Sequence, residues 1–347
     1  MTTRRKFLKT GAGLAGTAAL TAPAIHVSAK TTIKWRLQTY AGAPLAAHVV
    51  KPAIDSFNKI AGNDMQIELY YADQLVPTGE LFRAMQKRTI DAVQSDDDSM
   101  ASPTEVTVFG GYFPFASRYS LDVPVLFNQY GLGEIWAAEY EKVGVKHLSA
   151  GAWDPCHFNT KDPIRSLDDL KGKRVFTFPT AGRFLAQFGV VPVTLPWEDI
   201  EVAVQTGELD GVAWSGITED YTVGWADVTD YFLTNNISGA WIGSFYANMD
   251  SYNALPDNLK ELLKLTMDSS HYYRQWWYWG GEANLRVNGT KMQLTSIPDA
   301  EWAKVEEAAI KFWEEIAAES PTKRKVVNIF RQYNADMQKA GRPYRYG

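Results

Sequence analysis

The spacing of apolar residues changes repeatedly along the chain between a period of two and a period of three to four. Ile33–Gln38 alternates apolar and polar residues and predicts a strand, and Ala46–Ile60 repeats apolar residues at helical spacing. Met65–Tyr71 alternates again, and the pattern then predicts a helix from Leu81 and a strand at Ile90–Val93. This β-α-β-α-β order is typical of a mostly parallel sheet covered by helices, in which ligands bind at the carboxyl ends of the strands.

The same rhythm resumes after a segment rich in glycine, proline and aromatic residues, Phe109–Phe127. The predicted strands there are Val143–Leu148, Gly172–Phe178, Val190–Leu195 and Asp210–Trp214, and the predicted helices are Gly182–Phe188 and Trp197–Thr206. Two α/β sheets with a cleft between them are the simplest arrangement of all these segments.

The C-terminal part of the chain is predicted to be mostly helical. Pro256–Met292 carries apolar residues at helical spacing and is interrupted only by Gly280-Gly281. At about 1.5 Å per residue this segment could reach about 50 Å, longer than one small domain, so we expect it to lie across both lobes. Two amphipathic helices, Pro298–Ala318 and Arg324–Ala340, follow it.

The N-terminus has the composition of an export signal. Arg4-Arg5 precedes the small, apolar run Gly11–Leu20. This run is too short to span a bilayer, which needs about 20 apolar residues. Small residues allow cleavage after Ala24 or Ala29, of which we favour Ala29. We expect export to the periplasm by the twin-arginine route, and the alternative is a basic N-terminal helix on a cytoplasmic protein.

Charge and composition narrow the possible partners. Cleavage after Ala29 removes four basic residues and no acids, so the formal net charge changes from −5 to about −9. Such a charge disfavours nucleic acid and anionic membrane surfaces as partners. No second apolar stretch approaches spanning length, so we expect no direct membrane insertion. Cys156 is the single cysteine, which excludes an intrachain disulfide.

Several short motifs occur in a fixed order along the chain. They are Ala72–Pro77 with Glu80, Ile90–Ala92, His157–Ile164, Leu167–Lys173 and Gln205–Gly211. In order and spacing they resemble the periplasmic solute receptors of tripartite ATP-independent periplasmic (TRAP) transporters, in particular the branch of 2-oxo-acid receptors. The resemblance covers almost all of the chain after the export signal. It implies an α/β fold of the two-lobed, type II-like periplasmic binding protein class, with a long helix shared by both lobes.

The resemblance also implies a function and a division into lobes. Receptors of this family close around a small organic anion and deliver it to a membrane permease driven by an ion gradient. We expect the signal at 1–29, a first lobe formed by 30–150 with about 244–275, and a second lobe formed by 151–243 with about 276–347.

The arginine that commonly binds the substrate carboxylate in this family is replaced in this chain. The resemblance places Phe176 at its position, where a planar guanidinium would hold a carboxylate by two parallel hydrogen bonds. Arg174 lies two residues earlier, on the same face of the predicted strand, and Arg183 begins the next helix. Either arginine could take over the role.

The resemblance places a ligand contact at Trp214. At the family's metal-binding positions around it, however, this chain has other residues. The glutamate that helps 2-oxo-acid receptors to hold a metal ion is Ala213 here, and a glutamine of the second lobe falls near Pro155. Asp154 could supply one oxygen, but a hard cation needs several oxygens at once. We therefore expect no cofactor, and Asp154 is the remaining metal candidate.

An acidic run follows one of the predicted strands of the first lobe. Asp96-Asp97-Asp98 stands where an α/β sheet presents its ligand loop, although such a run could equally be a solvated turn. If one of these aspartates contacts the ligand while Phe176 replaces the arginine, the ligand would be neutral, zwitterionic or cationic. The other first-lobe candidates are Thr39, Tyr40 and Gln94.

Three tryptophans fall near predicted strand ends in or beside the second lobe, and they are Trp153, Trp214 and Trp241. Each could belong to the core, or could offer a ring face to a cation for about 0.5–2 kcal/mol. His157 fits a structural hydrogen bond better than a catalytic role.

Motifs of catalysis are scarce in this chain. It has no Gly-x-Ser-x-Gly elbow, no phosphate-binding glycine loop and no His-Glu-x-x-His pair. An exported hydrolase that uses paired carboxylates remains an alternative, because glycosidases need only two acids. We expect a receptor, first for an organic acid such as an oxo or hydroxy monocarboxylate with an apolar or aromatic part, and second for a zwitterionic, cationic or neutral solute. Its partners would be that solute and the permease.

Overall fold

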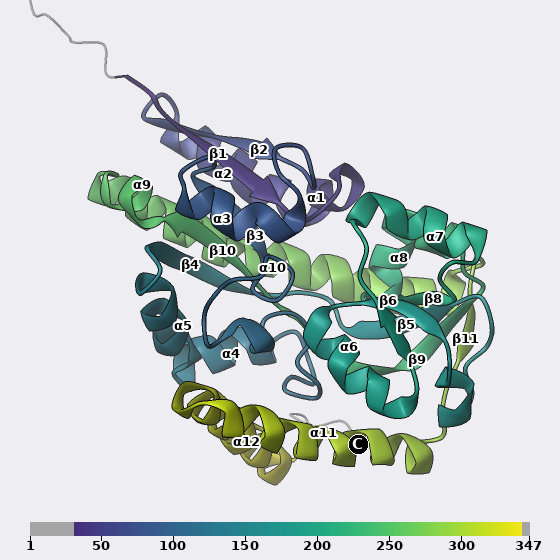
Figure 1. Ribbon diagram of the computed structural model, residues 1–347. Coiled ribbons are helices and arrows are strands. Elements are labelled where there is room, and N and C mark those ends of the chain that lie inside the picture. Colours follow the sequence, from purple (N-terminus) through teal and green to yellow (C-terminus); the bar gives the residue numbers. More distant parts are fainter. Residues whose placement is uncertain (1–30, 342–347) are drawn as a thin grey trace, which may run out of the picture. The chain divides into compact units, whose positions relative to one another are not determined.

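The protein is built around two β-sheets, one in each of two lobes (Figure 1). The computed structural model describes residues 31–341, so the predicted export signal lies outside the described residues. Within this range the first sheet has the order β2-β1-β3-β10-β4, with β1 (Ile33–Thr39), β2 (Met65–Tyr70), β3 (Ala92–Asp96), β4 (Val145–Ala152) and β10 (Ile242–Asn248). The second has the order β11-β9-β5-β8-β6-β7, with β5 (Cys156–Thr160), β6 (Arg174–Thr177), β7 (Val191–Val193), β8 (Gly211–Ala213), β9 (Tyr231–Ser238) and β11 (Gln293–Thr295).

Helices connect and cover these sheets. They are α1 (Ala43–Val49), α2 (Lys51–Ala61), α3 (Leu81–Gln86), α4 (Asp122–Gln129), α5 (Leu132–Glu141), α6 (Pro179–Leu185), α7 (Ile200–Thr206), α8 (Ile217–Val223), α9 (Met249–Asn253), α10 (Asp257–Asn288), α11 (Asp299–Glu319) and α12 (Pro321–Ala340). The pairing of β1 with β2 and with β3 is parallel, which confirms the β-α-β-α-β order predicted from the sequence.

The helix predicted over Ala46–Ile60 is two helices, α1 and α2. Between them Val50 leaves helical geometry, with φ −121° and ψ −49°. Pro52 explains the break, because proline has no N–H to continue a helix and its ring clashes with the preceding turn. In the first turn of a new helix the same residue is tolerated, and there it stands in α2.

The chain passes between the lobes through short segments that join strands. Residues 153–155 connect β4 of the first sheet to β5 of the second, and residues 239–241 connect β9 back to β10. β10 then inserts between β3 and β4, antiparallel to both. The hydrophobic pattern did not predict β10, because all its residues are buried and the strand therefore lacks the alternation of a half-exposed strand.

The long helix predicted from the sequence is α10, and it is shared by both lobes as expected. It contacts α2 and β4 of the first lobe and α8 of the second. Gly280-Gly281 does not interrupt it. A Cβ on Gly281 would lie 2.5 Å from the Thr218 side chain, so the absence of a side chain there lets α8 approach α10 closely.

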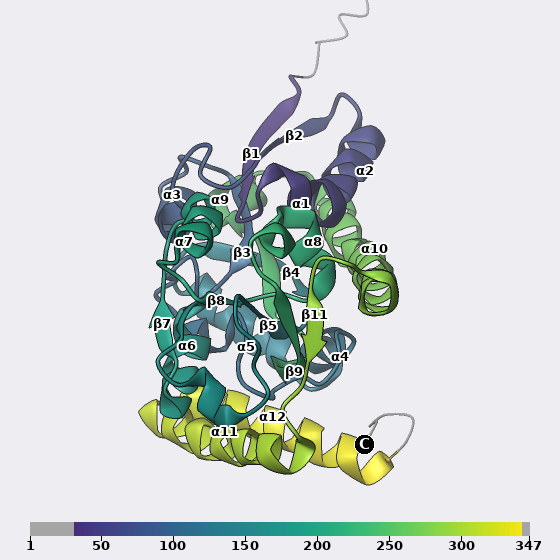
Figure 2. The ribbon, with the colours of Figure 1, turned by 90° about the vertical axis from the view of Figure 1, so that its right-hand side faces the viewer.

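The last two helices, α11 and α12, run side by side (Figure 2). α12 contacts α4 and α5, and Tyr333 donates a hydrogen bond to Asp122 at the start of α4. The C-terminal helix therefore lies against the first lobe, which differs from the expected assignment of the segment after residue 276 to the second lobe. Its amphipathic pattern shows an apolar face but not which surface that face covers.

Candidate functional site

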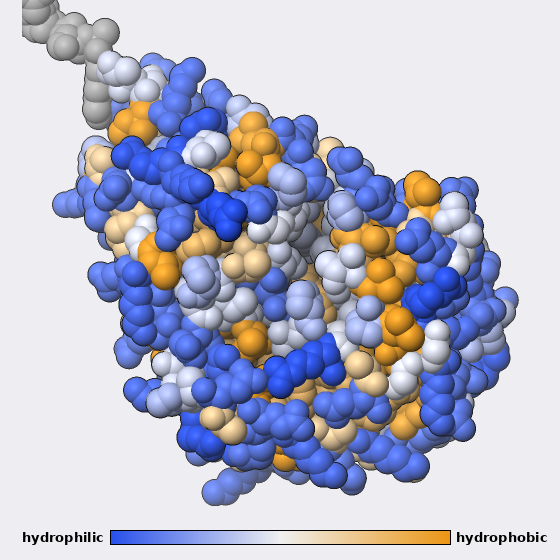
Figure 3. All heavy atoms as spheres, viewed as in Figure 1, coloured by the Kyte–Doolittle hydropathy of each residue, from blue (hydrophilic) through white to orange (hydrophobic). Residues whose placement is uncertain are grey.

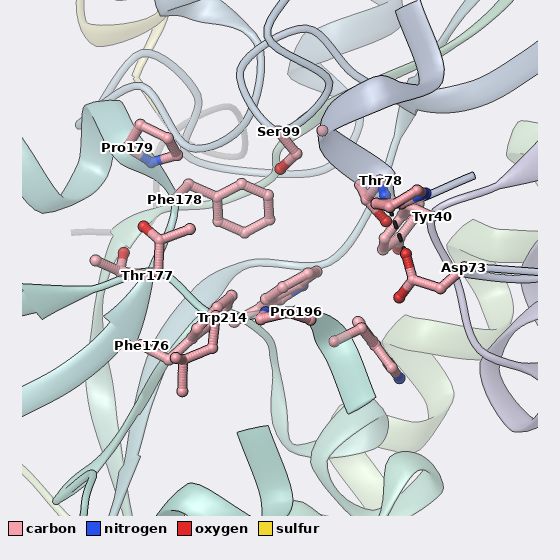
Figure 4. A pocket seen from close by; sticks show the side chains of 15 residues that line it. Tyr40, Asp73, Thr78, Ser99, Phe176, Thr177, Phe178, Pro179, Pro196 and Trp214 are labelled. Atoms are coloured by element: carbon pink, nitrogen blue, oxygen red, sulfur yellow. Dashed lines mark hydrogen bonds between the residues drawn. The ribbon is translucent and has the colours of Figure 1, made fainter. Parts of the chain in front are cut away.

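A cavity of about 300 Å³ lies between the two lobes, at the ends of their strands (Figure 4). Tyr40 lines it directly after β1, together with Ser99 and part of the loop after β2. From the second lobe, Phe176–Pro179 at the end of β6, residues 194–197 and Trp214 after β8 line the other side. Figure 3 shows the surface hollowed between the lobes. The carboxyl ends of strands from both sheets thus meet here, as ligand sites in α/β sheets require.

Aromatic rings form most of the wall. The Tyr40 ring lies 5.9 Å from Trp153, 6.1 Å from Trp197, 5.9 Å from Trp214 and 5.0 Å from Trp241, measured between ring centroids. Tyr40 and Trp214 are stacked at an angle of 21°. Such a cluster presents electron-rich ring faces, which attract cations and also accommodate flat or aliphatic groups.

Trp214 is also bounded by the second-lobe strand that precedes α6. Its ring stacks on Phe176 at 5.3 Å between centroids and touches Phe178 at 4.4 Å. Phe176, which the resemblance predicts at the family's arginine position, therefore lies in the cavity wall, and its apolar ring offers no hydrogen bond to a ligand carboxylate.

Buried polar atoms without a protein partner gather on both sides of the interlobe region. In the part of the chain that the structure describes, they include Tyr40 Oη, Gln94 Nε2, Ser95 Oγ and Asp96 Oδ2 in the first lobe and Asn159 Nδ2, Thr177 Oγ1, Trp214 Nε1, Glu219 Oε1 and Asp220 Oδ2 in the second. Buried polar groups are nearly always hydrogen-bonded in folded proteins. Atoms of this kind are therefore candidates for contacts with a ligand or with ordered water.

The first-lobe candidates Thr39 and Gln94 lie behind the cavity. Thr39 Oγ1 donates a hydrogen bond of 2.5 Å to Gln94 Oε1, and both residues are fully buried. Thr39 Oγ1 also accepts the N–H of Ala41, which fixes the turn that carries Tyr40.

The three consecutive aspartates are buried and not solvated, and each has a different environment. Asp96 Oδ1 accepts the N–H of Ser99 at 2.8 Å, and burial raises the pKa of this carboxyl to about 6. Asp98 Oδ2 accepts the N–H of Thr180, on α6 of the second lobe, at 2.8 Å. Burial raises the pKa of Asp98 to about 7. Asp98 therefore joins the two lobes by a hydrogen bond.

Asp97 points into the first lobe, away from the cavity. Its oxygens accept hydrogen bonds from Tyr140 Oη, from Tyr246 Oη at 2.8 Å and from Trp136 Nε1 at 3.1 Å. Burial raises its pKa to about 7. The structure therefore gives Asp97 a structural role, which corrects its place among the ligand candidates, because the turn that follows β3 brings its carboxyl to the donors of α5 and β10.

The structure brings neither candidate arginine to the cavity. Arg174 lies at the surface, where it forms an ion pair of 3.0 Å with Asp210, and Arg183 pairs with Glu319 at 3.1 Å. Neither arginine therefore lies where it could replace the family's carboxylate-binding arginine, which corrects that prediction. Of the described residues that line the cavity, none is lysine or arginine. A ligand in the cavity therefore meets no basic side chain of its wall.

A second group of acids lies on the second-lobe side. Asp154 accepts hydrogen bonds from Tyr112 Oη at 3.1 Å, Trp241 Nε1 at 3.0 Å and Gly216 N at 2.9 Å. Burial raises its pKa to about 7. Glu219, at the start of α8, accepts a hydrogen bond of 2.9 Å from Tyr278 Oη. Burial, and then the carboxyl of Asp154, raise the pKa of Glu219 well above its usual value.

Sequence reasoning missed Glu219 and Tyr278 as members of this region. The available signal was a pair of adjacent acids, Glu219-Asp220, five and six residues after Trp214. The position of Tyr278 had no such signal, because it comes from the inner face of α10.

The surroundings of Asp154 do not fit a metal ion. Its two oxygens accept one O–H and two N–H groups, so donor hydrogens occupy the directions that a cation would need. Within residues 31–341 no group of three or more His, Cys, Asp and Glu side chains could hold a metal.

Two residues near the cavity have structural surroundings. His157 Nδ1 lies 2.9 Å from the Leu233 carbonyl oxygen, and its Nε2 lies 3.0 Å from Arg286. The Cys156 thiol is buried.

No helix within the described residues is both long and apolar enough to cross a membrane.

Comparison with known proteins agrees with the fold. A TRAP periplasmic solute binding protein from Chromohalobacter salexigens DSM 3043, with bound (S)-(+)-2-amino-1-propanol, is 79% identical; it covers 91% of this chain and 100% of its own, with a TM-score of 0.90. A TRAP periplasmic solute binding protein from Pseudoalteromonas atlantica T6c, with bound sodium and pyruvate, is 18% identical; it covers 89% of this chain and 96% of its own, with a TM-score of 0.79.

A curated relative and a family model complete the comparison. The monocarboxylate 2-oxoacid-binding periplasmic protein of Nostoc sp. is 22% identical over 75% of this chain and 73% of its own length. Residues 47–320 match the model of the bacterial extracellular solute-binding proteins, family 7. Its members are solute-binding receptors and not enzymes, which sets the exported-hydrolase alternative aside. On this match, which spans most of the chain, the protein belongs to family 7 of the bacterial extracellular solute-binding proteins.

Proposed function

We propose that this protein is the periplasmic receptor of a TRAP transporter and that its solute is a small protonated amine of the amino-alcohol class. The observation that carries the proposal is the cavity itself, whose wall combines aromatic rings with no basic side chain. Asp96 in the first lobe and Glu219 in the second each have a buried carboxyl oxygen without a protein partner. A cation is stabilised by such surroundings, whereas a carboxylate ligand would find neutral donors such as Trp214 Nε1 and Thr177 Oγ1 in this wall but no positive charge.

The 79% identical protein, which carries bound (S)-(+)-2-amino-1-propanol, supports the same ligand class. A molecule of this size fits easily into about 300 Å³. Its ammonium group would face the acids and rings, and its hydroxyl and methyl groups would face Phe176 and Trp214. Tyr40, Asp96, Phe176 and Trp214 are accordingly the residues that we propose to contact the ligand.

An organic acid is the second candidate solute. Relatives of about 20% identity bind pyruvate or 2-oxoacids, and this family role was the first expectation from the sequence. In this chain Phe176 replaces the arginine that would bind the carboxylate, and Arg174 and Arg183 are paired at the surface. The organic acid would therefore have to be held by backbone N–H groups and hydroxyls.

The proposed cycle needs no chemical step. The ligand contacts both lobes only in the closed state, and it shifts the equilibrium toward closure by its differential affinity. The hydrogen bond between Asp98 and Thr180 would add to the closed state, because its two partners belong to different lobes. The closed receptor would then deliver the solute to the permease. Export by the twin-arginine route is part of the proposal and rests on Arg4-Arg5.

A ligand screen tests the proposal. The protein without its signal would be titrated with (S)-2-amino-1-propanol, with 1,2-propanediol as a neutral molecule of the same size, and with pyruvate. A ligand at about 100 times its dissociation constant stabilises the folded state by about 2.7 kcal/mol, which a thermal shift detects. Stabilisation by the amine alone is the expected result. Stabilisation by pyruvate alone would favour the organic acid, and no response to the amine would refute the proposed ligand class.

A further inference from the structure

Two carboxyl groups meet behind the Tyr40 ring, on the second-lobe side of the cavity. Asp154 follows β4 and Glu219 begins α8, and both side chains are fully buried. Gly216 links them: its N–H donates to Asp154 Oδ2 at 2.9 Å, and its carbonyl oxygen accepts the N–H of Glu219 at 3.1 Å. Two ionised carboxylates in contact repel each other strongly in a buried place, so this pair requires a positive charge or a proton between its members.

The oxygens of the pair are not equally satisfied. Asp154 accepts three hydrogen bonds, from Tyr112, Trp241 and Gly216. Glu219 accepts one, from Tyr278 to Oε2, and its Oε1 has no donor. Both oxygens of Asp154 already accept hydrogen bonds, so Glu219 Oε1 is the one oxygen of the pair without a partner and the first candidate to accept a hydrogen bond from a ligand.

Tyr40 connects this pair to the cavity. Its ring lines the cavity, while its hydroxyl is buried and has no hydrogen-bond partner. The Tyr40 ring lies 5.0 Å from the Trp241 ring, between centroids, and Trp241 Nε1 donates a hydrogen bond of 3.0 Å to Asp154, so Tyr40 lies close to this pair. Burial, and then the carboxyls of Glu219, Asp154 and Asp96, raise the pKa of Tyr40 well above its usual value. A polar group that enters beside the Tyr40 ring is therefore directed toward Glu219.

The rings around Tyr40 favour a cation at the same place. Trp153, Trp214 and Trp241 lie within 5.9 Å of the Tyr40 ring, between centroids. The remaining charged groups near the pair are Asp220, Glu282, Arg274 and Arg286. Of these, Arg274 lies over the Trp153 ring, 4.1 Å from a ring centroid, and Arg286 is paired with Glu282.

We propose that Glu219 determines the charge of the ligand: the ammonium group of the solute donates hydrogen bonds to Glu219 Oε1 and Tyr40 Oη, beside Asp154 and within the tryptophan cluster. The inference rests on the proposed function and assigns one end of the ligand to one residue. The selectivity of the receptor for an amine over the corresponding alcohol then depends on a single carboxylate, because neither Phe176 nor Trp214 can distinguish charge by an ion pair.

The test compares two probes in two variants. (S)-2-Amino-1-propanol and 1,2-propanediol differ in the amino group, and Glu219→Gln keeps an acceptor for Tyr278 while it removes the charge. We expect E219Q to weaken binding of the amine by about 10- to 100-fold, and thereby to bring its affinity closer to that of the weakly bound or unbound diol. Asp220→Asn is the matched control, since it removes an equal charge from the next residue of α8.

Each outcome decides the inference. An unchanged amine affinity in E219Q, in a protein whose parent binds the amine, would overturn the role of Glu219 and leave the proposed function intact. If E219Q and D220N weaken amine binding equally, the effect is a general one of lost negative charge, and the inference of a specific contact with Glu219 fails. A parent protein that does not bind the amine would refute both proposals. If E219Q does not fold, a crystal structure of the parent with the amine decides, because the nitrogen must then lie within about 3.2 Å of Glu219 Oε1.

Discussion

Replacement of Asp97 by alanine should destabilise the protein without a comparable effect on ligand affinity. Asp97 is the acceptor for Tyr140, Tyr246 and Trp136, and all three donors are fully buried. Each buried donor left without a partner costs about 1–3 kcal/mol, and water that enters the space recovers part of this. We therefore expect a loss of about 3–5 kcal/mol, which is a large part of a typical stability of about 5–15 kcal/mol.

Urea unfolding followed by circular dichroism would measure this loss, and calorimetric titration with the amine would measure the affinity. Asp97→Asn should lose less stability than Asp97→Ala, because the amide oxygen of asparagine still accepts hydrogen bonds. Some loss should remain, because the amide NH₂ of asparagine then faces one of the donors. Asp55→Ala is the control, because Asp55 is exposed on α2 and pairs only with Lys51, so its loss should cost less than about 0.5 kcal/mol. A D97A protein of parental stability that no longer binds the amine would refute the structural role and return Asp97 to the ligand site.

Three further predictions concern the cavity and the acids around it. Trp214→Ala should weaken amine binding by about 3- to 30-fold in a calorimetric titration, the range of one cation–π contact, and an unchanged dissociation constant would remove Trp214 from the site. Asp98→Ala removes the acceptor of Thr180, so small-angle scattering should show a more open ligand-bound receptor; an unchanged profile would exclude this bond from closure. Burial raises the pKa of Asp96 to about 6 and that of Asp154 to about 7, so the folded state holds protons that the unfolded state loses between about pH 4 and pH 7. The Tm of the ligand-free protein should therefore rise as the pH is lowered from about 8 to about 6.5, and a falling Tm there would contradict the burial of these groups; below about pH 6.5 the buried His147, His157 and His271, whose pKa burial lowers to about 3, act in the opposite direction.

The periodic parts of the fold could be predicted from the sequence. β1 and α10 have patterns that depend only on their own residues, because one face of each contacts a core. β10 could not be predicted, since a strand that is buried on every side has no alternation. The break at Val50 was signalled by Pro52, but the helical spacing on both sides outweighed it.

The site was predictable only in part, for a related reason. Tyr40 and Trp214 follow strands, and the position of strand ends is a local property. Whether a carboxylate faces water, a ligand or a tyrosine depends on elements distant in sequence, as the contact between Glu219 and Tyr278 shows. The same limit applies to Arg174, whose position on the strand face of Phe176 was foreseeable but whose pairing with Asp210 was not.

The location of the tryptophan cluster affects how the receptor would recognise its ligand. Trp153 and Trp241 belong to the segments 153–155 and 239–241 that join the lobes, and their rings stack at 4.7 Å between centroids. In a rotation about a hinge, displacement grows with distance from the axis, so residues in the connecting segments move least. Trp153 and Trp241 would therefore stay in contact while the lobes separate. An arriving ligand would meet a rigid aromatic surface, and ordering that surface would cost little further entropy.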